Sequence, residues 1–365
     1  MIRLLQLNDT NHSMNQLNKR QFDILEKIST KETLSSSDVL KVLNEKISLI
    51  TIKRDLEYLV KLKYLTRNGK GRGTVYQKTI VGVLFSPIDA SKYNEIEPDA
   101  RNGANSFNFS LFEEFPQDIF SNEEKEMLDN ATKNYKEKIR GITSVTQSKE
   151  LERFIIELSW KSSKIEGNTY TLLDTERLLR EGVSAEGHTP DEATMIINHK
   201  KAFSFILENI KHLGKNGITA GFIEKIHELL TFDLGVSKGV RHGLVGIIGT
   251  KYKPLDNKYQ INEALNSLYQ VINSMKNAYS KALTILLGIS YIQPFEDGNK
   301  RTARLLCNAF LLFENCAPLS YRSVSENNYR ESILVFYEKN SLIPMKEIFM
   351  EQYIFSTQNY LVNTP

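Results

Sequence analysis

Between Pro116 and Pro190 the chain contains no proline, and this interval constrains the fold more than any other feature of the sequence. Proline lacks the backbone N–H that an α-helix needs, so a long interval without it leaves room for long helices. Segments such as LERFIIELSW and TERLL, inside the interval, space their apolar residues as one face of a helix does. Helical patterns resume around Pro294, Pro318 and Pro344 and continue to the C-terminus. We therefore expect a mainly α-helical body.

The composition is that of a globular protein. Apolar residues make up 41% and charged residues 25% of the 365 residues, which excludes wholesale disorder, a collagen-like fibre and a membrane protein. The longest apolar run, from Ile285 to Ile292, is too short to span a bilayer. The N-terminal residues do not have the pattern of a secretory signal, and Cys307 and Cys316 form neither a disulfide framework nor a metal-ligand pattern. We expect two or three domains and a cytoplasmic location.

Charge divides the chain into a basic head and a mildly acidic body. Residues 1–80 hold 15 Lys or Arg against 8 Asp or Glu, whereas the remaining residues hold 32 against 36. The head has three segments with apolar residues at helical spacing, around residues 22–28, 39–43 and 52–62. Two short strands then flank a Gly-rich basic turn. The head therefore reads as three helices and a hairpin.

This pattern resembles the winged helix–turn–helix family over roughly residues 15–80, and we assign residues 1–85 to such a domain. The resemblance implies DNA binding through the third helix and the hairpin tip. The side chains placed to contact DNA are Thr51, Lys53, Arg54, Lys70 and Arg72. Lysine and arginine at these positions would neutralise backbone phosphates. The alternative is a head that docks a partner protein or dimerises the chain.

The rest of the chain divides into a connection and one large domain. Residues 86–120 are rich in Asn, Ser, Pro and acidic residues, so we expect a linker or irregular connection there. Residues 121–365 read as a single helical domain. Residues 245–252, which end before Pro254, interrupt the helical pattern and predict a small β-hairpin.

The stretch GISYIQPFEDGNKRTARLLCNAFLLF, residues 288–313, says most about function. Pro294 and Phe295 end one apolar helix, residues 296–299 form a turn, and a helical face resumes after that turn. A helix N-terminus has unpaired N–H groups and a positive partial charge, so it is suited to hold phosphate. Glycine lets the backbone approach a ligand closely. The stretch therefore predicts an anion-binding loop that leads into a helix.

Three charged side chains fit that interpretation. Arg301 and Arg304 are three residues apart, so both guanidinium groups rise from one side of the helix and can contact phosphate oxygens. Asp297 offers an oxygen ligand for a Mg²⁺ ion bound to the phosphates. Together these residues predict a nucleotide site.

The same residues resemble the Fic family, whose core motif reads His-Pro-Phe, any residue, an acid, Gly-Asn-Gly-Arg, two residues, Arg. The chain matches this motif at Pro294, Phe295, Asp297, Gly298, Asn299, Arg301 and Arg304. Upstream, SSKIEG is similar to the family's inhibitory motif and contains Ser162, Glu166 and Gly167. The segment from Val240 to Tyr252 is similar to the flap hairpin that holds a target beside the active site, and it contains Gly249, Thr250 and Lys251.

The resemblance implies a compact helical bundle with a flap. It also implies transfer of AMP from ATP to a Ser, Thr or Tyr hydroxyl of a target protein, or of the chain itself. Asp297 would hold Mg²⁺, and Glu166 would inhibit the domain by pairing with Arg304. The residues that would line the phosphates of ATP are Gly298, Asn299, Lys300, Arg301 and Arg304.

Two positions depart from the family pattern. Gln293 stands where the family has its general-base His, and a carboxamide cannot take up a hydroxyl proton. Gln293 is compatible with four interpretations: a weakened enzyme, an inactive enzyme, altered chemistry or an engineered substitution. Lys300 stands where most members have Gly, which brings the string GNKR closer to the Doc branch, whose members transfer a phosphoryl group.

Two further functions stay open at this point. The chain could be a DNA-bound regulator whose Fic domain senses a nucleotide, because a basic head precedes a site without its base. It could also be a toxin-like module whose head docks a partner protein. The target protein, the DNA sequence preference and a homodimeric state cannot be read from the sequence.

Overall fold

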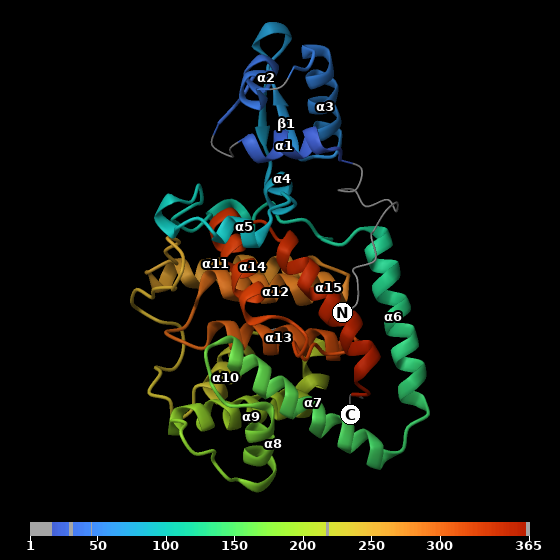
Figure 1. Cartoon of the computed structure of the whole chain (residues 1–365), viewed down its shortest axis with the longest axis vertical. Helices are drawn as coiled ribbons and strands as arrows, with labels where there is room; N and C mark the ends of the chain where they lie inside the picture. The colour runs from blue at the N-terminus through green and yellow to red at the C-terminus, as the bar shows by residue number, and fades with distance from the viewer. Residues whose placement is uncertain (1–16, 29–31, 45, 217–218, 363–365) are drawn as a thin grey trace.

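The structure of the chain, a computed structural model, describes residues 17–28, 32–44, 46–216 and 219–362. In Figure 1 the head forms a lobe above a larger helical body, and helix α4 (Ile80–Leu84) connects the two. The first domain that the sequence predicts starts at residue 1, and its residues 1–16 lie outside the described residues. The boundaries of the three predicted segments stay predictions.

The head consists of three helices followed by an antiparallel hairpin, which is the element order that its sequence predicts. Two serines begin α2 and α3 by accepting hydrogen bonds from backbone N–H groups, Ser35 from Asp38 and Ser48 from Thr51. The apolar faces of the helices meet the hairpin in a small core of their own. The elements are α1 (Lys19–Lys27), α2 (Ser36–Leu43), α3 (Leu49–Lys61), β1 (Leu65–Asn68), the short η1 (Gly71–Gly73) and β2 (Val75–Lys78).

The segment between head and body is irregular, as expected, but it is not a free linker. It contains only short helices: α5 (Ala90–Asn94), η2 (Pro98–Ala100) and η3 (Phe109–Leu111). Its apolar side chains are buried in the core of the body: Phe107, Leu111, Phe112, Ile119 and Phe120. Burial of several aromatic side chains anchors the segment on the body, because each removes a large apolar area from water.

The body is built of helices around α12 and α13, which confirms the mainly α prediction. Helix α12 is apolar on all sides because α11, α13 and α14 pack around it, and it runs beside α13 through the middle of the body (Figure 1). Within the described ranges no helix is both long and apolar enough to cross a membrane. The helices are α6 (Asn122–Arg140), α7 (Ser144–Ile165), α8 (Leu172–Glu181), α9 (Pro190–Asn216), α10 (Ala220–Leu230), α11 (Lys258–Ser274), α12 (Ala278–Ile292), α13 (Asn299–Phe313), α14 (Glu326–Lys339) and α15 (Ile343–Asn359).

The predicted β-hairpin over residues 245–252 is wrong. In the part of the chain that the structure describes, β1 and β2 form the single sheet. The backbone after residue 248 bonds to a different segment: Gly249 O accepts from Arg101, and Lys253 N–H donates to Asn105 O. These groups are therefore not available to pair with residues 245–248, and the flap is an extended, irregular loop.

Candidate functional site: the loop between α12 and α13

The loop that joins α12 to α13 is fixed by two residues with left-handed backbone. Gln293 ends α12 at φ 52°, and Gly298 precedes α13 at φ 77°. A Cβ atom on Gly298 would lie 3.0 Å from the Thr231 methyl, so the position favours glycine on two grounds. The Asn299 amide closes the loop, since it accepts from the Phe295 N–H at 2.9 Å and donates to the Phe295 carbonyl at 2.8 Å. These two hydrogen bonds fix the backbone at the start of α13, so the unpaired N–H groups of its first turn face the loop.

Arg301 is buried beside this helix end with part of its guanidinium group unused. Its side chain is 2% exposed, and Nη2 donates to Asp297 Oδ2 at 2.9 Å. The other terminal nitrogen, Nη1, is buried and has no hydrogen-bond partner among the described residues. A buried donor without an acceptor costs free energy, and a bound anion would supply the acceptor. The arrangement fits a phosphate group at the N-terminus of α13.

Arg304 lies one turn further along α13 and is completely buried. Its guanidinium donates to the Ser162 hydroxyl at 2.9 Å, to the Ser162 carbonyl at 2.8 Å and to Glu166 Oε1 at 2.9 Å. It also lies 5.3 Å from the centre of the Tyr329 ring, a cation–π distance. Ser162 and Glu166 therefore contact the same arginine from α7.

The Glu166 carboxylate has a separate cation for each oxygen. Oε1 contacts Arg304, and Oε2 lies 2.8 Å from Lys300 Nζ. Burial raises the pKa of Glu166, but the attraction of the two cations outweighs burial and lowers this pKa to about 2. Gly167 then turns the chain away at φ 100°. The carboxylate is thus ionised at neutral pH and lies against the two basic side chains that flank the start of α13.

Gln293, the last residue of the helix end that precedes the loop, has a side chain held by two hydrogen bonds. Its side-chain amide donates to the Ser290 carbonyl at 2.6 Å and to the Tyr337 hydroxyl at 3.3 Å. The Arg241 side chain donates to the Gln293 carbonyl at 2.7 Å and so contacts the backbone at the end of α12. A carboxamide held in this way can orient a hydroxyl group, but it cannot take up a proton.

The family resemblance makes His227 and His242 the histidines nearest to position 293, and each has a contact of its own. His227 stacks on Phe295 with ring centres 3.7 Å apart, and its Nε2 contacts the Asp297 carbonyl at 3.0 Å. Burial lowers the pKa of His227 to about 4. His242 is exposed on the flap, 3.3 Å from Lys258 Nζ. His227 therefore supports the loop, as a neutral ring.

Asp297 can hold a metal ion only together with a ligand. Its side chain is 67% exposed and one oxygen already contacts Arg301. Among the described residues, no group of three or more His, Cys, Asp or Glu could hold a metal ion. Mg²⁺ commonly binds one or two carboxylates plus substrate phosphates and waters. The residues present fit a Mg²⁺ ion that arrives with a nucleotide.

The flap residues are tied to the body around Glu338. This buried carboxylate pairs with Arg101 at 3.2 Å and accepts from the Thr250 hydroxyl at 2.7 Å. The Lys251 ammonium donates to the Arg101 carbonyl, and the Tyr252 hydroxyl donates to the Tyr291 carbonyl at 2.9 Å. Gly249 joins the same cluster through its carbonyl. Ahead of these anchors, Ile248 is 98% exposed. Residues 249–252 of the flap are thus fixed to the body, whereas the apolar side chain of Ile248 is in solvent.

The side chains proposed to bind DNA all lie on the head, away from the loop between α12 and α13. Lys53 and Arg54 are exposed on α3, and Lys70 and Arg72 are exposed at the hairpin tip. Thr51 is half-buried, and its hydroxyl lies 2.9 Å from that of Ser48, the cap of α3.

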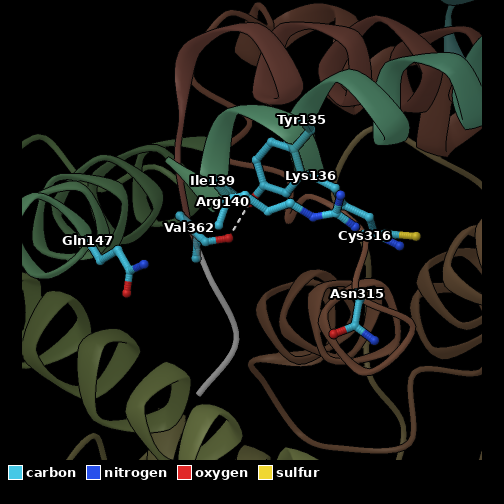
Figure 2. Close-up of a pocket in the computed structure, with 8 residues that line it drawn as sticks. All are labelled: Tyr135, Lys136, Ile139, Arg140, Gln147, Asn315, Cys316 and Val362. Atoms are coloured by element: carbon cyan, nitrogen blue, oxygen red, sulfur yellow. Dashed lines mark hydrogen bonds between the residues drawn. The ribbon is translucent and has the colours of Figure 1, made fainter. Parts of the chain in front are cut away.

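A cavity in the described part of the chain lies away from this loop. It has a volume of about 460 Å³ and lies near the C-terminal ends of α6 and α13 (Figure 2). The loop between α12 and α13 is at the other end of α13, about 20 Å away along a helix of this length. Lys136 and Arg140 line the cavity on the last turns of α6, where basic side chains complement the helix dipole. We assign it no functional role.

Comparisons with known proteins find related sequences and related folds. Residues 217–311 match the model of the Fic/DOC family. The protein adenylyltransferase Fic of Nematostella vectensis is 24% identical over 213 residues, which cover 57% of this chain and 49% of that protein. The protein of the same name from Drosophila yakuba is 27% identical over 181 residues, which cover 47% of this chain and 34% of that protein. The chain thus spans half or less of the length of these curated relatives.

Solved structures share the fold at low identity. A Fic domain containing signaling protein from Bacteroides thetaiotaomicron aligns with a TM-score of 0.53 and 19% identity, covering 64% of this chain and 94% of that one. Fic-1 from C. elegans aligns with a TM-score of 0.53 and 21% identity, covering 65% of this chain and 71% of that one. The body therefore has a mainly helical Fic-type fold. Residues 217–311, which match the model of the Fic/DOC family, lie within this body.

Sequence reasoning missed three contacts at this site. The ion pair of Lys300 with Glu166 had one visible signal, the opposite charges of GNKR and SSKIEG. Arg241 lies in the segment from Val240 to Tyr252, and no local pattern indicates that its side chain donates to the Gln293 carbonyl. The contact of Gln293 with Tyr337 joins residues on different helices, and no local pattern points to it.

Proposed function

We propose that the chain is a Fic-type ATP-binding protein with the machinery of a protein adenylyltransferase, in an autoinhibited form. The observation that carries the proposal is the buried ion pair of Glu166 with Arg304, 2.9 Å apart. Beside it, Nη1 of Arg301 has no hydrogen-bond partner among the residues that the structure describes. An anion-binding helix end that is occupied by an internal carboxylate is what an autoinhibited phosphate site requires.

ATP would place its phosphates along the N-terminus of α13. The backbone N–H groups after Gly298 and the side chains of Arg301 and Arg304 would bind phosphate oxygens, and Asn299 would keep the loop in shape. Asp297 would hold Mg²⁺, which when bound neutralises phosphate charge and polarises the phosphoryl group.

Glu166 inhibits by competition for a guanidinium group. While its Oε1 contacts Arg304, a phosphoryl group cannot use the same donor, and two anions at this place would repel each other. The α7 turn at Ser162 and Gly167 places the carboxylate there. Inhibition ends when the Glu166 side chain leaves.

Gln293 weakens the chemistry. The attacking hydroxyl of a target needs a base to take its proton, and loss of such a base typically costs about 10²–10⁴-fold in rate. The Gln293 carboxamide can still orient the hydroxyl. The flap residues 249–252 would hold the target segment that brings the hydroxyl to this point. The target is a protein with a Ser, Thr or Tyr side chain, or the chain itself.

A labelling experiment tests this proposal and separates AMP transfer from phosphoryl transfer, the Doc-like alternative that Lys300 raises. The chain carrying Glu166→Gly and Gln293→His is incubated with Mg²⁺, cell lysate and ATP labelled on either the α- or the γ-phosphate. We expect protein labelling from α-labelled ATP only. Labelling from the γ-position alone would replace adenylylation by phosphorylation, and no labelling from either would remove the transferase function.

A second function is favoured by the head. The exposed side chains of Lys53 and Arg54 on α3 and of Lys70 and Arg72 on the hairpin support DNA binding, with the Fic domain as a nucleotide sensor. A mobility-shift assay with genomic fragments, with and without ATP, distinguishes this regulator from a head that docks a protein. The cytoplasmic location and the homodimer stay predictions.

A further inference from the structure

Lys300 has a single partner among the described residues, and that partner is Glu166. Arg304 differs, because it also bonds to Ser162 and lies over the ring of Tyr329. If the Glu166 carboxylate leaves, Arg304 stays fixed by these contacts, whereas the Lys300 ammonium loses its only described counter-ion. Lys300 is therefore the cation whose charge is released when the inhibitory contact opens.

The position of Lys300 determines what this released charge can bind. Lys300 is the second residue of α13, directly after the loop of Gly298 and Asn299. It shares the helix end with Arg301, whose Nη1 has no hydrogen-bond partner in the described part of the chain. The Lys300 side chain is 28% exposed and its ammonium sits on a flexible four-carbon stem, so it can follow a ligand at this end of the helix. Lys300 and Arg304 each contact one oxygen of the Glu166 carboxylate. A phosphoryl group has at least two oxygens as well, so it can contact the same two cations.

We infer that Lys300 has two alternating partners: the Glu166 carboxylate in the closed site and a phosphoryl group of the bound nucleotide in the open one. This inference rests on the proposed function, because the nucleotide is the ligand proposed there. The ionised Glu166, whose pKa is held at about 2, keeps the closed contact intact at neutral pH. Lys300 thus strengthens inhibition and also raises nucleotide affinity once inhibition ends.

The two roles oppose each other, and this opposition is measurable. Replacing Lys300 with Ala removes a phosphate contact, which weakens ATP binding. In the intact chain it also weakens the closed state, which favours ATP binding. In a Glu166→Gly background only the first effect remains. We expect Lys300→Ala to weaken ATP binding about three- to tenfold in the Glu166→Gly background and clearly less, or not at all, when Glu166 is present.

Calorimetry with Mg²⁺ and ATP on four chains measures both roles: the intact chain, E166G, K300A and the double variant. Lys164→Ala is the matched control, because it removes the same charge from a side chain that lies over the Trp160 ring. The substitution keeps the Lys164 carbonyl, which accepts from the Glu166 N–H. Equal losses from K300A in both backgrounds would refute the alternation. Unchanged affinity in the Glu166→Gly background would refute the phosphate contact.

A second measurement separates failure of this inference from failure of the proposed function. Urea unfolding of K300A, Glu166→Gln and the double variant, without nucleotide, gives the coupling of the two residues directly. If E166G binds no ATP, the proposed function fails together with the phosphate role. If the unfolding cycle then also shows no coupling, the closed contact fails as well.

Discussion

Arg330 on α14 holds the carbonyl of Ile165, the residue directly before Glu166. Its guanidinium donates to this oxygen from Nε at 2.8 Å and from Nη2 at 2.6 Å. The carbonyl belongs to the last residue of α7, where a cation is stabilised by the helix dipole. The neighbouring residue on α14, Tyr329, lies against Arg304. Helix α14 therefore contacts the residue before Glu166 through Arg330 and contacts Arg304 through Tyr329. These two contacts hold the partners of the ion pair in position relative to each other.

Replacing Arg330 with Ala should loosen the turn that carries Glu166. Charge-assisted hydrogen bonds at a solvent-accessible site contribute about 1 kcal/mol, so we expect hydrogen exchange to become roughly fivefold faster in the turn. The amides to follow are those of Gly167 and Asn168, which bond to the carbonyls of Lys164 and Ser163. Arg177→Ala, which removes an exposed pair with Glu181, is the control. Unchanged exchange at both amides would contradict the role of Arg330.

The ion pairs of Glu166 should give the stability of the chain a distinct pH dependence. The pKa of Glu166 is lowered from 4.5 to about 2 in the folded chain, so its contribution is complete above about pH 5 and is lost as pH falls toward 2. The side chain is 15% exposed, and the shift corresponds to roughly 3 kcal/mol.

We expect the free energy of unfolding to fall less steeply between pH 5 and pH 3 in Glu166→Gln than in the intact chain. Urea denaturation at several pH values measures this difference. Glu263→Gln, at an exposed position on α11, should run parallel to the intact chain. Parallel curves for Glu166→Gln and the intact chain would show that the carboxylate has no ionic partner.

Gln293→His should restore a general base without straining the loop. The residue has φ 52°, a conformation that His adopts more readily than most side chains. In a Glu166→Gly background we expect transfer of label from ATP at least about a hundredfold faster with His than with Gln. Gln293→Asn, which keeps a carboxamide and tolerates the same backbone, is the control. Equal rates for His and Asn would mean that position 293 does not determine the chemistry.

Lys53 and Arg54 should each supply a phosphate contact if the head binds DNA. Replacing either with Ala is expected to weaken binding of genomic fragments and to reduce the salt slope by about 1. Lys92→Ala, an exposed lysine on α5, should have no effect. Mobility shifts at several salt concentrations measure the slope. No shift of any fragment at about 50 mM salt, where phosphate contacts are strong, would remove the DNA-binding function.

The parts of the fold that sequence could predict are those fixed by local chemistry. Ser35 and Ser48 indicate the starts of α2 and α3, because each hydroxyl accepts a hydrogen bond from the backbone N–H three residues later. The glycine at 298 marks the start of α13 because the backbone there is left-handed. Each of these signals needs only neighbouring residues, so it can be read from a short string.

The parts that sequence could not predict depend on distant partners. The flap has a hairpin-like string, yet its backbone bonds to residues 101–105, and no short string reports that competition. Residues 86–120 have the composition of a linker, but Phe107 and Phe112 pack into the body core. The contacts of Lys300 and Arg330 with α7 join segments more than a hundred residues apart, so only the folded arrangement reveals them.

The central claim is that Glu166 occupies a place that a phosphoryl group of ATP would otherwise take on Arg304. A direct measurement is the affinity for ATP and Mg²⁺, by calorimetry, of the intact chain and of Glu166→Gly. A charge-assisted contact contributes about 1.5–3 kcal/mol, so we predict roughly ten- to a hundredfold tighter binding for the variant. Arg304→Ala, with its fold verified by circular dichroism, should weaken binding and abolish the gain from Glu166→Gly. Equal affinities of the intact chain and Glu166→Gly, or a gain that persists without Arg304, would contradict the claim.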